Sequence, residues 1–164
     1  MYNRLVALRN RAEERWAQID VQLTRRHDLI PNLVETVKGY AGHEREVLTS
    51  VTEARAAAVS AGSVGEQAQA EGMLTSALRS LFAVSEAYPQ LQADQNFREL
   101  QTELARTEDL LAGARQSYNL AVREYDTALE SFPTNIVGGM FNFEPREYFE
   151  LADPAAASAP EVRF

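Results

Sequence analysis

Apolar residues recur along the first 59 positions at alternating steps of three and four. This spacing places them on one face of an amphipathic helix and is typical of long antiparallel, coiled-coil-like bundles. From Trp16 onward only Arg26 and Glu44 are polar in the stripe. The pattern predicts one long helix over residues 1–59. Its stripe comprises Leu5, Leu8, Ala12, Trp16, Ile19, Leu23, Arg26, Ile30, Leu33, Val37, Tyr40, Glu44, Val47, Val51, Ala54 and Ala58.

Pro31 lies inside this predicted helix. A proline in a helix interior removes the hydrogen bond to the carbonyl four residues back, here that of His27, at a cost of about 3 kcal/mol. Asp28 could instead cap a new helix with Pro31 in its first turn. The spacing of apolar residues passes through Pro31 without a reset, which favours a kink over a reversal. Because two glycines follow, we expect bending around residues 28–42.

Two further helical patterns follow a turn near Ser60. The first covers residues 66–88 and the second residues 92–132, which end before Pro133. These patterns predict an all-α fold, an elongated antiparallel up-down helical bundle of three to four long helices. We expect residues 1–164 to form a single domain.

The remaining segment, residues 133–164, predicts an irregular aromatic tail. Its aromatic residues alternate with glycine and proline, and we expect them to dock on the bundle because so many are costly to leave in water. The final segment, residues 155–164, reads AAASAPEVRF, and we expect it to be flexible, with contacts to the bundle only at Val162 and Phe164. The aromatic residues are Phe132, Phe141, Phe143, Tyr148 and Phe149.

Charge narrows the classes of function. The net charge of -8 argues against general nucleic-acid binding through a basic surface. The charge is unevenly distributed, because residues 1–26 hold six arginines against three acids.

The chain contains no cysteine, which excludes disulfides and thiol chemistry. No run of residues reaches the roughly 18 apolar residues that a membrane-spanning helix requires.

The sequence offers little catalytic chemistry. His43 begins the run HEREV, which lacks the second histidine of a zinc-binding HExxH motif, so we interpret His27 and His43 as surface residues. No nucleophile-elbow, Walker or dinucleotide-binding fingerprint is present. Tyr118 and Tyr125 occupy apolar-stripe positions and are explained by core packing. We therefore predict no catalytic residues, no cofactor and no metal.

Polar side chains crowd the region around Pro31. There, backbone carbonyls left without helical donors could meet a partner or solvent. The alternative is an ordinary charged helix face with internal ion pairs. We predict a partner-binding surface made of Arg25, Arg26, His27, Asp28, Asn32, Glu35 and Lys38.

Two blocks of the sequence resemble the LemA family of bacterial proteins. The first, residues 2–44, reads YNRLVALRNRAEERWAQIDVQLTRRHDLIPNLVETVKGYAGHE, and ARAAA at residues 54–58 fits its continuation. The second, residues 118–150, reads YNLAVREYDTALESFPTNIVGGMFNFEPREYFE. The departures are small, with His27 where tyrosine is common and Asp126 where asparagine is common.

The resemblance implies a helical bundle tethered by one transmembrane helix that immediately precedes Tyr2. That helix is not in this sequence, and the family offers no catalytic residues to carry over. If such a helix precedes Tyr2, the six nearby arginines place the domain on the cytoplasmic side of the cell membrane by the positive-inside rule. They could also lie against anionic lipid head groups.

These observations lead to one main functional prediction and two alternatives. The main prediction is a non-enzymatic, membrane-tethered scaffold or adaptor that binds a protein partner through the central part of the first helix. One alternative is an enzyme, or enzyme subunit, with a small-molecule site near Pro31. The other is a bundle that oligomerises on the membrane.

Overall fold

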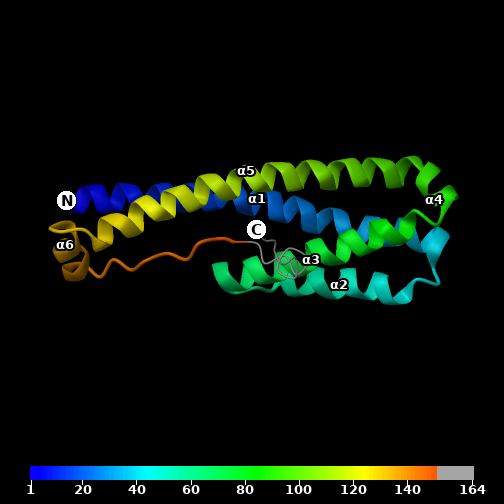
Figure 1. The fold of residues 1–164 in the computed structure, drawn as a ribbon, viewed down its shortest axis with the longest axis horizontal. Coiled ribbons are helices and arrows are strands. Elements are labelled where there is room, and N and C mark those ends of the chain that lie inside the picture. Colours follow the sequence, from blue (N-terminus) through cyan, green and yellow to red (C-terminus); the bar gives the residue numbers. More distant parts are fainter. Residues whose placement is uncertain (151–164) are drawn as a thin grey trace, which may run out of the picture. The chain divides into compact units, whose positions relative to one another are not determined.

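The computed structural model describes residues 1–150, which form helices and no strand (Figure 1). The expectation about residues 155–164 lies outside this range. The helices are α1 (Tyr2–Ala41), α2 (Arg45–Val59), α3 (Val64–Ser85), α4 (Pro89–Ala93), α5 (Gln95–Glu130) and α6 (Thr134–Met140).

The chain divides into two compact units, and α1 and α5 contribute to both. Unit 1 consists of Met1–Leu23 and Glu108–Phe149, and unit 2 contains Thr24–Thr107. Within unit 1, Arg11 of early α1 pairs with Glu124 of late α5 at 3.0 Å. Within unit 2, Asn32 of late α1 and Asn96 of early α5 are joined by a 3.3 Å hydrogen bond. The two helices therefore run in opposite directions, and the predicted antiparallel all-α bundle is confirmed.

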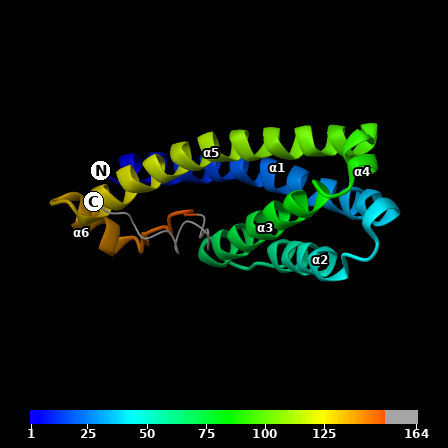
Figure 2. The same cartoon turned by 45° about the vertical axis from the view of Figure 1, so that its right-hand side comes forward.

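The predicted continuous helix over residues 1–59 is wrong at residues 42–44. There α1 ends, the Glu44 N–H donates to the Ala41 carbonyl at 3.0 Å, and α2 begins at Arg45. Both views show α2 running back alongside α1 (Figures 1 and 2). The apolar spacing did not reveal the reversal, because α2 carries a stripe in the same phase that packs into the same core.

Pro31 does not end α1, which continues through it to Ala41. The preference for continuation over reversal at this position is therefore confirmed. The sequence signal for the true reversal was the pair Gly39 and Gly42, of which Gly39 lies in the last turn of α1 and Gly42 directly follows its final residue, Ala41.

The core of unit 2 is formed by α1, α2, α3 and α5, with Leu91 from the short α4. Phe97 of α5 is fully buried there and packs against the ring of Phe82, with ring centroids 5.9 Å apart. Buried aliphatic side chains from the other helices fill the rest. They include Ile30, Leu33 and Val37 from α1, Leu48 and Val51 from α2, and Leu74 and Leu81 from α3.

Local capping explains where α3 and α5 begin. The Ser63 hydroxyl accepts the Glu66 N–H at 3.1 Å, the expected arrangement at a helix N-terminus. Asp94 precedes α5 and accepts the Phe97 N–H at 2.9 Å. The predicted helices over residues 66–88 and 92–132 are confirmed to within three residues at each end.

The tail after α6 runs back along α5 as an extended segment, residues 144–149, which we call the tail strap. The hydroxyls of Tyr125 and Tyr118 donate to the carbonyls of Glu144 and Glu147, each at 2.8 Å. The Asn119 amide both accepts from and donates to the backbone of Phe149, at 2.8 and 3.0 Å. Side chains of α5 therefore hold the tail strap through hydrogen bonds to its backbone.

The expectation that the tail aromatics dock on the bundle is only partly correct. Phe149 is fully buried, and its ring packs against that of Trp16 with centroids 5.3 Å apart. Phe143 is half-buried. The remaining three are exposed, namely Phe132, Phe141 and Tyr148.

Candidate functional site

Two of the predicted site residues, Arg26 and His27, point into unit 2. Both are buried, at 2% and 8% exposure, and both meet Glu71 of α3, which is fully buried. The interpretation of His27 as a surface residue is therefore wrong. We call Arg26, His27, Gln67, Glu71 and Thr75 the buried polar cluster.

Glu71 is the centre of the buried polar cluster. Its Oε2 atom lies 2.5 Å from His27 Nε2 and accepts a 2.8 Å hydrogen bond from the Gln67 amide. Its Oε1 atom lies 3.6 Å from Arg26 Nε. Arg26 also donates through Nη2 to the Glu71 carbonyl at 3.0 Å and to the Thr75 hydroxyl at 2.7 Å. The charge of Arg26 is thus compensated inside the bundle, as a buried cation requires.

The carbonyl that Pro31 leaves without a helical donor also has an internal partner. Arg55 Nε–H of α2 donates to the His27 carbonyl oxygen at 2.7 Å. This carbonyl is therefore not available to an outside partner, contrary to the expectation for the region around Pro31. The hydrogen bond instead ties α2 to α1 within unit 2.

The other five predicted site residues are exposed on α1. These five residues are spaced by three or four positions, which keeps them on one side of the helix. We call Arg25, Asp28, Asn32, Glu35 and Lys38 the exposed stripe. The structure thus divides the predicted surface into a buried pair and an exposed stripe.

Contacts with α5 and along α1 order parts of the exposed stripe. Arg25 forms an ion pair with Glu103 of α5. Asn32 accepts a hydrogen bond from Asn96, and Lys38 pairs with Glu35 at 3.6 Å. These pairs are solvent-exposed, and such pairs each contribute about 0–1 kcal/mol to stability. Breaking them therefore costs little free energy.

Beyond the stripe, Tyr40 links the end of α1 to the start of α5. Its hydroxyl donates to Asp94 at 2.6 Å. This hydrogen bond raises the pKa of Tyr40 and, together with the Phe97 N–H, lowers the pKa of the Asp94 carboxyl. The carboxylate form of Asp94 is therefore favoured, which suits its second role as the cap of α5.

Four residues of this region were not identified from the sequence, namely Arg55, Gln67, Glu71 and Thr75. Glu71 lies three, seven and ten residues before Leu74, Leu78 and Leu81, so its place in the apolar stripe of α3 was readable. Arg55 carried no comparable signal. Its role depends on the reversal at residues 42–44, which brings α2 back beside Pro31.

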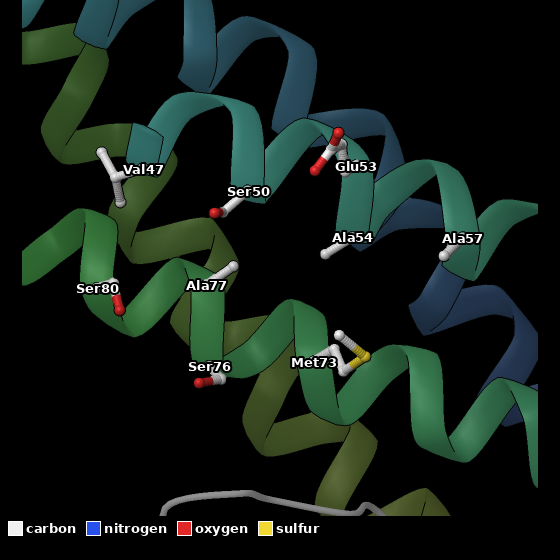
Figure 3. A pocket seen from close by; sticks show the side chains of 9 residues that line it. All are labelled: Val47, Ser50, Glu53, Ala54, Ala57, Met73, Ser76, Ala77 and Ser80. Atoms are coloured by element: carbon white, nitrogen blue, oxygen red, sulfur yellow. The ribbon is translucent and has the colours of Figure 1, made fainter. Parts of the chain in front are cut away.

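A shallow groove of about 400 Å³ lies between α2 and α3 (Figure 3). It is lined mainly by small or apolar side chains, and Met73 points into it from α3. None of the predicted site residues lines this groove. The lining residues are Val47, Ser50, Glu53, Ala54, Ala57, Met73, Ser76, Ala77 and Ser80.

The described part of the chain lacks two classes of feature. In residues 1–150, no cluster of three or more histidine, aspartate or glutamate side chains is placed to hold a metal ion. None of the helices in the same range is both long and apolar enough to cross a bilayer.

Comparison with known proteins places these features in a family. Residues 15–164 match the model of the LemA family. The chain is 26% identical over 175 residues to magnetosome protein MamQ 2 of Paramagnetospirillum magneticum, an alignment that covers 91% of this chain and 64% of that protein. It is 25% identical over 174 residues to magnetosome protein MamQ of Magnetospirillum gryphiswaldense, covering 90% and 64%. The chain thus spans a little under two thirds of the length of these relatives, and by the extent of the family match it belongs to the LemA family.

Proposed function

We propose that this protein is a non-enzymatic, membrane-tethered scaffold that binds a protein partner through the exposed stripe of α1. The observation that carries the proposal is the division of the polar residues around Pro31. Arg26 and His27 are used internally, whereas Arg25, Asp28 and Glu35 are presented to solvent on the same helix.

The buried polar cluster supports this role by setting the rotation of α1. Hydrogen bonds and ion pairs require defined geometry, so Arg26 and His27 can meet Glu71 in few orientations of the helix. Arg55 adds a second directional link at the His27 carbonyl. A helix fixed in this way presents the exposed stripe in one orientation, which lowers the cost of ordering it on binding.

The membrane tether is part of the proposal. The resemblance to the family implies a transmembrane helix before Tyr2, and six arginines within residues 1–26 favour the cytoplasmic side. Accessibility labelling of the full-length protein in intact cells tests the side. We expect the exposed stripe to be protected from an impermeant reagent, and labelling from outside would contradict the proposed orientation.

Partner binding is tested by a double substitution in the exposed stripe. We expect Arg25→Ala with Glu35→Ala to abolish the recovery of a specific protein co-purified with the full-length protein from native membranes. Both side chains are exposed, so the change in the free energy of unfolding should stay below about 1 kcal/mol. Arg26 is left intact because its removal would disrupt the core of unit 2.

The matched control is Glu53→Ala with Arg98→Ala, which removes one acid and one base from exposed positions elsewhere in unit 2. The control should retain the partner. If the stripe variant and the control retain the same set of proteins, binding through the exposed stripe is refuted.

A further inference from the structure

α6 presents an apolar face to solvent. Ile136 and Met140, one helical turn apart, are 53% and 70% exposed, and Phe132 and Phe141 next to the helix are 79% and 55% exposed. A short surface helix ordinarily turns its apolar side chains toward the core. We call Phe132, Ile136, Met140 and Phe141 the apolar tip.

The outward direction of the apolar tip is fixed by the opposite face of α6. Val137 packs against the buried cluster of Leu5, Leu8, Tyr125 and Ala128. Gly138 approaches so closely that an added Cβ would lie 2.8 Å from Leu129 Cδ2. Val137 and Gly138 therefore hold α6 against the core of unit 1, and Ile136 and Met140 remain exposed.

The chemistry of the segment points to an apolar environment. Residues 131–143, SFPTNIVGGMFNF, contain no charged side chain, although charged residues make up 24% of the chain. Glu130 and Glu144 bracket the segment. Large exposed apolar side chains gathered together mark contacts with membranes or other proteins.

The neighbours of the apolar tip favour a membrane over a protein. The ring of Tyr2 packs against Phe141, with centroids 4.8 Å apart, and Arg9 lies over the ring of Phe143 at 4.8 Å. Arg4 is exposed on the same turn of α1 as Tyr2. Aromatic rings and arginines are the residues that settle at the boundary between head groups and acyl chains.

We propose that the apolar tip inserts into the interfacial region of a bilayer containing anionic lipids. The inference rests on the proposed function, because a tether that ends before Tyr2 would hold Phe141 at the membrane surface. Insertion would then give the tethered domain a second attachment and a fixed orientation. It would be shallow, because Glu130 and Glu144 limit the segment that can enter the apolar region.

The absence of cysteine allows a clean test with a single fluorescent label. Met140→Cys is labelled with the environment-sensitive dye NBD in the 164-residue chain, which is attached by an N-terminal His tag to vesicles. The vesicles contain phosphatidylcholine, phosphatidylglycerol and a nickel-chelating lipid. We expect a blue shift and an intensity gain on the order of twofold when the label enters the interface.

The matched control is Met73→Cys, an equally simple exchange at an exposed methionine of α3. Its label should not respond to the vesicles. Phe132→Ser with Phe141→Ser should remove the response at position 140 while leaving the attachment unchanged, which separates insertion from mere proximity.

Three results would overturn the inference. They are equal responses at positions 140 and 73, a response at position 140 that survives the double serine substitution, and a response without vesicles that grows with protein concentration. The last would assign the tip to a second copy of the chain. The tether is tested separately, because a full-length protein that does not fractionate with membranes contradicts the proposed function whatever the label shows.

Discussion

Arg55 Nε–H donates a 2.7 Å hydrogen bond to the backbone carbonyl of His27, the group that Pro31 deprives of its helical donor. A buried carbonyl without a donor is costly, so the cost of the proline is partly offset by a side chain from the next helix. The pairing explains how α1 continues through Pro31. Because Arg55 lies on α2, the pairing also depends on the reversal between α1 and α2.

We expect Arg55→Leu to lower the free energy of unfolding by about 1.5–3 kcal/mol, the range for a hydrogen bond to a charged donor. In a Pro31→Ala background the loss should be clearly smaller, because the backbone N–H of the introduced alanine supplies the missing helical donor. Urea unfolding of the four proteins of this double-mutant cycle measures the difference. Equal losses in the two backgrounds would show that Arg55 does not act through this carbonyl.

We expect Glu71→Ala to lower the free energy of unfolding far more than the small number of atoms it removes would suggest. It leaves Arg26 buried without its carboxylate, a change that typically costs about 3–5 kcal/mol. Glu71→Gln keeps a hydrogen-bond acceptor for the neighbouring side chains and should cost less. Glu53→Ala, at an exposed site on α2, should change stability by less than about 0.5 kcal/mol. Thermal or urea unfolding gives the ranking, and similar losses for Glu71→Ala and Glu53→Ala would contradict the role of the buried polar cluster.

Asn119→Ala should release the end of the tail strap. The substitution removes both hydrogen bonds to Phe149, each of which contributes about 0.5–1.5 kcal/mol. The single tryptophan, Trp16, packs on Phe149 and reports the change without a label. We expect a red-shifted Trp16 emission and faster hydrogen exchange at the Phe149 amide. Unchanged values for both would mean that packing alone holds the strap.

Asp126→Asn should stabilise the protein at neutral pH. Burial raises the pKa of the Asp126 carboxyl above its ordinary value of 3.8, and the hydrogen bond from the Arg146 N–H opposes this only in part. Because the folded-state pKa is the higher one, the favourable contribution of Asp126 is present at low pH and is lost as the pH rises through that value. The asparagine should therefore gain stability over the parent protein at neutral pH and lose this advantage as the pH falls below the ordinary aspartate pKa. An advantage that grows on acidification would show the opposite sign of the shift.

The sequence predicted the fold class because apolar spacing reports which side of each helix is buried. Arg26 fell in the apolar stripe for that reason, although we also predicted it as part of the partner-binding surface, and its burial contradicts that second prediction. The spacing does not report the direction of the chain. Two antiparallel helices whose apolar residues continue the same spacing therefore look like one helix, and for this reason the reversal at residues 42–44 was missed. Local capping marks the start of α3, with Ser63 before the helix and Glu66 in its first turn, but our sequence prediction did not use this signal.

The candidate site was predictable only in part. All seven residues lie on α1, but whether a polar side chain is used internally depends on what another helix brings to it. His27 is buried because Glu71 lies opposite, 44 positions away in the sequence. The exposure of the apolar tip could not be predicted from the sequence either. Aromatic residues are ordinarily expected to be buried, and only the fold shows that α6 directs these side chains to solvent.

The exposed stripe of α1 is, in this proposal, the surface that meets a partner. The most direct measurement replaces Asp28 with photoreactive benzoylphenylalanine in the full-length protein and compares its crosslinks in living cells with those from the exposed position of Ala56 on α2. We expect a discrete crosslinked protein from position 28, absent from position 56 and lost when Arg25→Glu is added. Identical crosslinking patterns from both positions, or a product at position 28 that survives Arg25→Glu, would contradict the claim.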